Sequence, residues 1–133
     1  MAQQDRLDTA LRAFEAMGHG IVTGDFEPFA AYLADDIVLT FFGTTKAAGT
    51  FQGKPLVIRW FRGVHKYFPE GLAFSVRNAM ASADAAAIEW EDRGVTTGGR
   101  LYENHGVSIF EFRGDTVSAY REYIDTERVK AFF

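Results

Sequence analysis

The sequence predicts a single α+β domain, in which a curved antiparallel sheet packs against helices on one face. The chain has 133 residues, 47% hydrophobic and 24% charged, which is typical of one globular domain spanning residues 1–133. Apolar residues follow a mainly helical spacing in the first half and alternate with a period of two in the second. Helices that gather early and strands that gather late are typical of the α+β class.

Three helices are expected in the first half. Residues 5–23 carry an apolar stripe, and Gly24 suits the left-handed position that ends a helix. A short helix is expected over residues 26–34, with Pro28 in its first turn, where a missing N–H costs little. Residues 54–67 form the third helix, which also begins with a proline and shows an apolar stripe.

One strand is expected among these helices, and four follow them. Residues 36–42 are β-branched and aromatic, which favours a strand, whereas the glycines of residues 43–53 predict a loop. Short turns join the later strands and predict antiparallel hairpins. These strands are expected over residues 72–81, 85–96, 101–113 and 116–124, and residues 126–133 are expected to form a short helix capped by Asp125.

Composition excludes several classes of function. The net charge is −4, and the Lys and Arg residues are scattered, so nucleic acid is not an expected partner. No apolar run is long enough for a bilayer span, and the polar N-terminal stretch has no hydrophobic signal region, so we expect a cytoplasmic protein that contacts no membrane. The chain has no cysteine, and its three histidines lack metal-ligand spacing, so we expect no metal and no cofactor.

Aromatic residues are unusually frequent. They make up 15% of the chain, and 13 of the residues are Phe. Such a surplus belongs in a large core, a lined cavity or a partner surface.

Several short motifs, taken in order, carry a resemblance to a known family. They are Gly24-Asp25, Ala34-Asp35-Asp36, Gly53-Lys54, Tyr102-x-Asn104 and the closing Tyr120-Arg121-Glu122-Tyr123-Ile124-Asp125-Thr126. Over nearly the whole chain, this pattern resembles the SnoaL-like branch of the NTF2-like superfamily. The resemblance implies a cystatin-like α+β cone barrel, in which the bent sheet wraps over three helices, encloses an apolar cavity and often dimerises through its outer face.

Two readings of the strand at residues 85–96 stay open. Strict alternation puts Glu89, Glu91 and Arg93 on one face, and an apolar set with Trp90 and Asp92 on the other, so the charged face would be exposed to solvent. Resemblance to the epoxide-hydrolase members implies the opposite orientation. In that reading the two catalytic acid positions fall on Glu91 and Glu122, and Glu89 stands where those enzymes have arginine.

If these glutamates face a dry cavity, they cannot all ionise. Burial and like charge would raise at least one pKa, so that one carboxyl donates a proton while its neighbour accepts one. Arg93 would then replace the missing arginine. Catalytic candidates are therefore Glu122, Glu91 and Glu89.

The remaining site candidates surround this expected cavity. Tyr102 and Asn104 share a strand face and would orient a ligand, and Tyr120 shares the inward face of the last strand with Glu122. The expected apolar lining is Leu39, Phe41, Trp60, Val64 and Ile124.

Two classes of function follow. One is a cofactor-free acid–base enzyme of the isomerase, cyclase or hydrolase type, acting on a small apolar molecule. The other is a non-catalytic module for ligand binding or dimerisation. In either case the outward Val107, Ile109 and Tyr123 are too apolar for an ordinary solvated face, which predicts a homodimer through the sheet.

Overall fold

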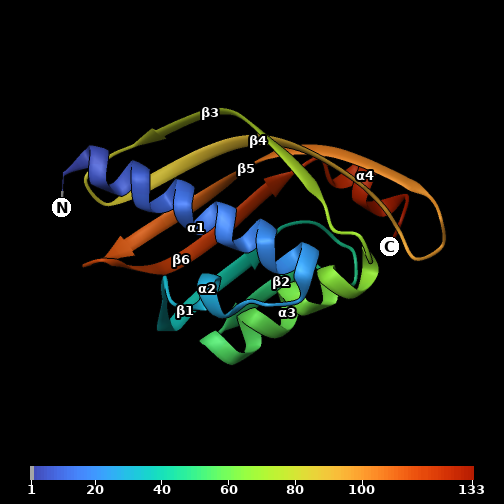
Figure 1. Ribbon diagram of the computed structural model, residues 1–133, viewed down its shortest axis with the longest axis horizontal. Helices are drawn as coiled ribbons and strands as arrows, with labels where there is room; N and C mark the ends of the chain where they lie inside the picture. Colours follow the sequence, from blue (N-terminus) through green and yellow to red (C-terminus); the bar gives the residue numbers. More distant parts are fainter. Residues whose placement is uncertain (1) are drawn as a thin grey trace.

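A computed structural model describes residues 2–133 as four helices and one six-stranded sheet (Figure 1). In chain order the elements are α1 (Gln3–Thr23), α2 (Glu27–Ala30), β1 (Leu33–Phe41), β2 (Gly49–Gln52), α3 (Lys54–Tyr67), β3 (Ala73–Ala81), β4 (Ala85–Val95), β5 (Leu101–Arg113), β6 (Thr116–Ile124) and α4 (Thr126–Lys130). The α+β class and the curved sheet are thus confirmed.

The sheet is open and contains one parallel pair. Its strand order is β2-β1-β6-β5-β4-β3, so β2 and β3 are free edges. Neighbouring strands run antiparallel except β1 and β6, which are parallel. The expected cone barrel is therefore a curved sheet that does not close, and the expected antiparallel pairing holds for every neighbouring pair except β1 and β6.

The helices cover one face of this sheet. Figure 1 shows α1 crossing the long strands, with α2 and α3 beside its C-terminal half. Helix α1 contacts β3 and β4, whereas α3 contacts β1 and β2, and α4 contacts β5. The space between sheet and helices is thus bounded by α1 on one side and by α3 on the other.

Local signals account for most element ends. Helix α1 ends at Gly24, whose φ of 82° is left-handed and whose N–H donates to the Gly20 carbonyl at 2.7 Å. Helix α4 begins after Asp125, whose side chain accepts from the backbone N–H groups of Glu127 and Arg128.

The stretch between α1 and α3 differs most from the prediction. The expected helix over residues 26–34 shrinks to the four residues of α2, and β1 begins at Leu33 because this residue pairs with Val117 of β6. The expected loop at residues 43–53 contains β2, which pairs with β1. Pairing with distant strands decided both segments, and such partners leave no local sequence signal.

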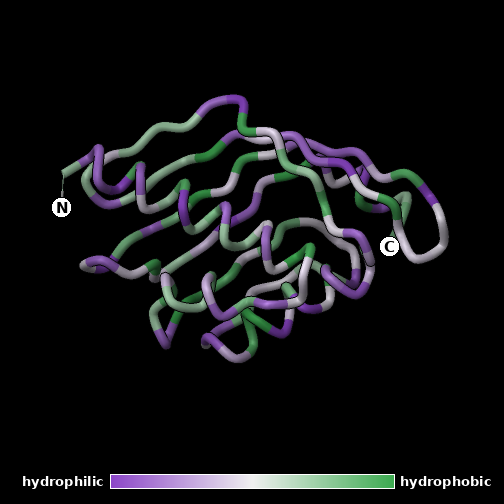
Figure 2. Tube along the Cα trace, in the orientation of Figure 1, coloured by the Kyte–Doolittle hydropathy of each residue, from purple (hydrophilic) through white to green (hydrophobic). Residues whose placement is uncertain are grey.

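Figure 2 shows hydrophobic and hydrophilic residues interspersed along the helices and strands. The apolar faces of the sheet and the helices enclose a buried cluster that is rich in aromatic residues. Phe61 of α3 packs edge-on against Phe29 and Tyr120, with ring centroids 5.1 and 5.9 Å apart.

No helix within residues 2–133 has both the length and the apolarity needed to cross a membrane.

Candidate functional site

A cavity of about 360 Å³ lies between the inner face of the sheet and the helices. Its walls come from α1, α3, the sheet strands and the segment after β6. Most of the lining is apolar, and includes Met17, Phe41, Trp60, Phe61, Phe74 and Trp90. Part of the aromatic surplus therefore surrounds a hollow.

Two carboxyl groups line this cavity. Asp92 projects from β4 and Glu122 from β6, and their exposed fractions are only 7% and 8%. Each follows its strand's alternation, because Asp92 shares a face with Trp90, and Glu122 shares a face with Tyr120. Carboxyl groups are rarely buried this deeply unless paired, so this pair is a candidate for chemistry.

Burial raises the pKa of both carboxyl groups to about 7. For Asp92 the largest cause is desolvation, followed by the negative charge of Glu122, while a hydrogen bond from the Asn104 backbone acts in the opposite direction. For Glu122 the cause is again desolvation, and the Tyr120 hydrogen bond lowers the pKa. Because the two groups repel each other, their protons are lost in steps that belong to the pair.

A chain of hydrogen bonds leads to Glu122. The Trp90 indole N–H donates to Ser108 Oγ at 2.9 Å, Ser108 Oγ lies 2.7 Å from Tyr120 Oη, and Tyr120 donates to Glu122 Oε1 at 2.7 Å. Indole nitrogen can only donate, and the single Tyr120 proton is directed at Glu122, so the Ser108 proton is directed at Tyr120. Every donor in the chain therefore supports negative charge on Glu122.

Tyr102 lines the cavity and carries a hydroxyl group. Asn104 Nδ2 donates to Tyr102 Oη at 2.9 Å and to the Asp125 carbonyl at 3.2 Å. Within residues 2–133 the Tyr102 hydroxyl has no acceptor of its own, so its proton is available to a ligand. Burial, followed by the negative charge of Asp92, raises the pKa of Tyr102, which keeps it a donor at neutral pH.

The predicted site residues divide into those at the cavity and those behind it. Leu39, Tyr120 and Asn104 are buried but do not line the cavity, and Asn104 acts through Tyr102. Those in the cavity wall are Glu122, Tyr102, Phe41, Trp60, Val64 and Ile124.

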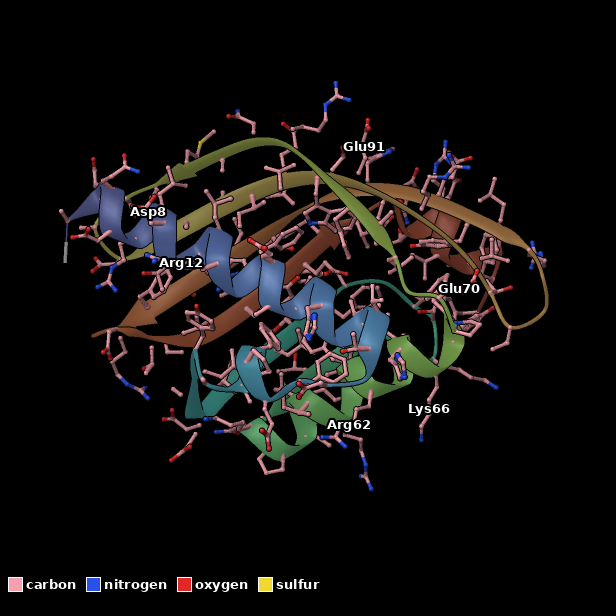
Figure 3. All side chains as sticks on the ribbon, in the orientation of Figure 1. Asp8, Arg12, Arg62, Lys66, Glu70 and Glu91 are labelled. Atoms are coloured by element: carbon pink, nitrogen blue, oxygen red, sulfur yellow. The ribbon has the colours of Figure 1, made fainter. Side chains whose placement is uncertain are left out.

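Glu89, Glu91 and Arg93 are on the opposite face of the sheet, so the inward orientation implied by the resemblance is wrong for all three. Each is exposed, and Glu91 forms an ion pair with Arg77 of β3 at 3.1 Å. Figure 3 shows Glu91 projecting from the side of the sheet away from the helices. The simple alternation argument, which put the charged set toward solvent, describes this strand correctly.

Asp92 is the acid that sequence reasoning missed. A one-residue offset in a strand turns a side chain to the other face, and the expected acid position on Glu91 is one residue away from Asp92. The available signal was an acidic residue on the same face as Ile88 and Trp90.

Gly106 of β5 lies opposite Trp90 and is closely packed. A Cβ there would lie 3.0 Å from the Trp90 ring and 2.4 Å from the Tyr123 carbonyl oxygen, so the space beside this glycine is filled by protein and does not hold a ligand.

No group of three or more His, Asp and Glu side chains in residues 2–133 is placed to hold a metal ion. The chemistry available to the described site is proton transfer between two carboxyl groups and a tyrosine in an apolar environment.

Comparison with known proteins identifies the family. The SnoaL-like domain matches residues 10–120, which is most of the chain. The chain belongs to the SnoaL-like domain family. No curated protein matches the sequence.

Solved structures of other proteins share the fold of this SnoaL-like domain. An NTF2-like protein from Anabaena variabilis is 26% identical, with a TM-score of 0.84 and coverage of 94% of each chain. A proposed SnoaL-like polyketide cyclase from Jannaschia sp. is 18% identical, with a TM-score of 0.83 and coverage of 97% of this chain and 91% of that one. A proposed isomerase from Bacillus subtilis is also 18% identical, with a TM-score of 0.80 and coverage of 95% and 93%.

Proposed function

We propose that this SnoaL-like protein is a cofactor-independent acid–base enzyme that acts on a small apolar substrate held in the cavity. The observation that carries the proposal is the pair Asp92 and Glu122, buried in one apolar cavity with pKa values raised to about 7. A general acid or base is most effective when its pKa lies near the working pH.

The surroundings of the two groups favour Glu122 as the base. Tyr120 donates to Glu122, which stabilises the ionised form. Asp92 Oδ1 is buried and has no hydrogen-bond partner in residues 2–133. A buried carboxylate oxygen without a donor is costly, even though the Asn104 backbone donates a hydrogen bond to this carboxyl group, so the proton of the pair resides on Asp92, which then serves as the acid.

The reaction would move a proton between two positions of the substrate. Glu122 removes a proton from carbon or water, Asp92 returns one, and Tyr102 donates a hydrogen bond to the oxygen that gains charge. Isomerisation, ring closure and water addition all fit this scheme. Support comes from similar structures described as a proposed isomerase and a proposed polyketide cyclase.

A carboxyl-carbon NMR titration of the whole protein tests the acid–base pair. We expect Asp92 and Glu122 to titrate near pH 7, and Glu122→Gln to lower the pKa of Asp92 because it removes a neighbouring negative charge. Glu91→Gln, at an exposed site on the same strand as Asp92, is the matched control and should leave the pKa of Asp92 unchanged.

Ordinary carboxyl pKa values at Asp92 and Glu122 would overturn the enzymatic proposal. The cavity would then serve a non-catalytic ligand-binding module, the alternative that needs no titrating group. The cytoplasmic location and the homodimer remain predictions from the sequence.

A further inference from the structure

The cavity opens between α3, the loop before β2 and the segment after α4. Four of its lining residues are exposed and therefore mark the opening, which we call the mouth: Lys46, Arg59, Gly63 and Phe133. Arg59 and Gly63 are one turn apart on α3, so they lie on the same face of that helix.

Both cations at the mouth lack an acidic partner. Neither Lys46 nor Arg59 forms an ion pair within residues 2–133, whereas Lys54, earlier on α3, pairs with Asp35 at 3.5 Å. Cations that line a cavity without a partner are available to an anionic group of a ligand.

Charge is distributed unevenly around this mouth. Helix α3 carries four basic and no acidic residues, while the rest of the chain has ten basic and eighteen acidic residues and hence a net charge of −8. A positive helix on an otherwise negative molecule attracts anions to one side, and the mouth opens on that side.

Resting on the function proposed above, we infer that the substrate is an apolar molecule with one anionic group, and that Lys46 and Arg59 hold this group at the mouth. The apolar body then lies among Phe41, Trp60 and Phe61. The ionised Glu122 repels an anion from the interior, so the anionic group stays at the mouth and the opposite end of the substrate faces the carboxyl pair.

Gly63 keeps the opening wide. A Cβ built on this residue meets nothing within 4 Å, so neither packing nor backbone conformation explains a glycine inside α3. Glycine in a helix interior costs up to about 1 kcal/mol relative to alanine. A large side chain at this position would project into the mouth.

Two dyes that differ by one charge test the inference: 8-anilinonaphthalene-1-sulfonate and its uncharged parent N-phenyl-1-naphthylamine. Fluorescence titrations should show that Lys46→Gln/Arg59→Gln weakens binding of the sulfonate dye about two- to thirty-fold, the range expected for two exposed ion pairs. Binding of the neutral dye should change less than about twofold, because it makes no ion pair. Added salt should weaken binding of the sulfonate dye and leave binding of the neutral dye unchanged.

Two further variants locate the binding. Arg62→Gln is the matched charge control, because Arg62 points away from the molecule on the same helix and does not line the cavity (Figure 3). Gly63→Trp should prevent binding of both dyes, because the large side chain would project into the mouth. Circular dichroism would establish that each variant is folded.

The outcomes separate the two proposals. If the double variant weakens binding of both dyes equally, or of neither, the inference that the substrate carries an anionic group is refuted, while the cavity remains a ligand site. If the wild-type protein binds neither dye, or if Gly63→Trp blocks neither, the cavity is not the ligand site, and both this inference and the proposed function are wrong.

Discussion

Burial of two carboxyl groups makes the stability of the folded chain depend on pH. Asp92 and Glu122 have pKa values of about 7 in the folded state, above their ordinary values. The folded state therefore binds more protons than the unfolded state at mildly acidic pH. Stability is greatest at low pH in this range and falls as the pH rises through 7.

We predict that the free energy of unfolding decreases by about 2 kcal/mol per carboxyl group between pH 5.5 and pH 8. Urea denaturation at the two pH values measures the decrease. The variant Asp92→Asn/Glu122→Gln lacks both carboxyl groups and should lose most of this dependence. An equal decrease in wild type and variant would contradict the raised pKa values.

Tyr120 controls the charge of Glu122 through a single hydrogen bond. Its hydroxyl is buried, donates to Glu122 Oε1 and lies 2.7 Å from Ser108 Oγ. Tyr120→Phe removes the donor, so we predict a further rise in the pKa of Glu122 and a stability loss of about 1–2 kcal/mol.

Carboxyl NMR and urea denaturation together measure both effects of Tyr120→Phe. Tyr123→Phe is the control, because Tyr123 lies on the outer face of the same strand and is 46% exposed. If Tyr123→Phe shifted the pKa of Glu122 as far as Tyr120→Phe does, the hydrogen-bond chain would not be the cause.

At the level of elements, Arg6 ties α1 to two turns of the sheet. Its side chain is 6% exposed, and its Nε donates to the Ala83 carbonyl between β3 and β4 at 2.8 Å. Arg6 also donates to the Gly114 carbonyl between β5 and β6, and its guanidinium lies 4.7 Å from the centre of the Phe112 ring. One side chain thus joins the start of α1 to both hairpins.

We predict that Arg6→Ala lowers the free energy of unfolding by about 2–3 kcal/mol, because it removes two hydrogen bonds from a charged donor and the contact of the guanidinium with the Phe112 ring. Arg12→Ala on the same helix is the matched control, since Arg12 is exposed and its Nε donates to the Asp8 carbonyl of α1 itself. It should cost less than about 0.5 kcal/mol. Similar losses for the two variants in urea denaturation would show that Arg6 does not clamp the turns.

Elements with strong local signals were predictable, and those that depend on distant partners were not. The bounds of α3, β5 and β6 agree with the periodicity and turn signals of their own residues. In contrast, β2 is four residues long and exists because β1 lies beside it. Nothing within its own sequence distinguishes such a strand from a glycine-containing loop.

At the scale of the whole molecule, the outer face of the sheet retains apolar side chains without a covering layer. Phe42 and Tyr123 are 38% and 46% exposed, and their rings stack with centroids 4.6 Å apart. Val107 and Ile109 of β5 are half-buried on the same face. Contiguous apolar surface of this kind favours association of two copies.

We predict a homodimer, with Tyr123→Glu/Ile109→Glu shifting it to a monomer. Sedimentation equilibrium should give about twice the 14.8 kDa chain mass for the wild type and the chain mass for the variant. Val22→Glu serves as the control, because Val22 is an exposed apolar residue on α1, away from the sheet's outer face. A monomeric wild-type protein would contradict the prediction.

Local residue patterns were sufficient to predict the α+β class, most of the elements and the alternation within each strand. They thereby predicted that Asp92 shares a face with Trp90 and that Glu122 shares a face with Tyr120. These properties follow from turn residues and from side-chain periods of two and 3.6, which are local.

The face of β4 that the helices cover follows from the packing of elements that are distant in the sequence. That packing turned Asp92 into the cavity, left Glu89 and Glu91 outside, and brought Asp92 close enough to Glu122 for their charges to interact. The raised pKa values arise from desolvation and, at Asp92, also from the negative charge of Glu122. Both depend on what surrounds a side chain in space, which the order of residues along the strand does not contain.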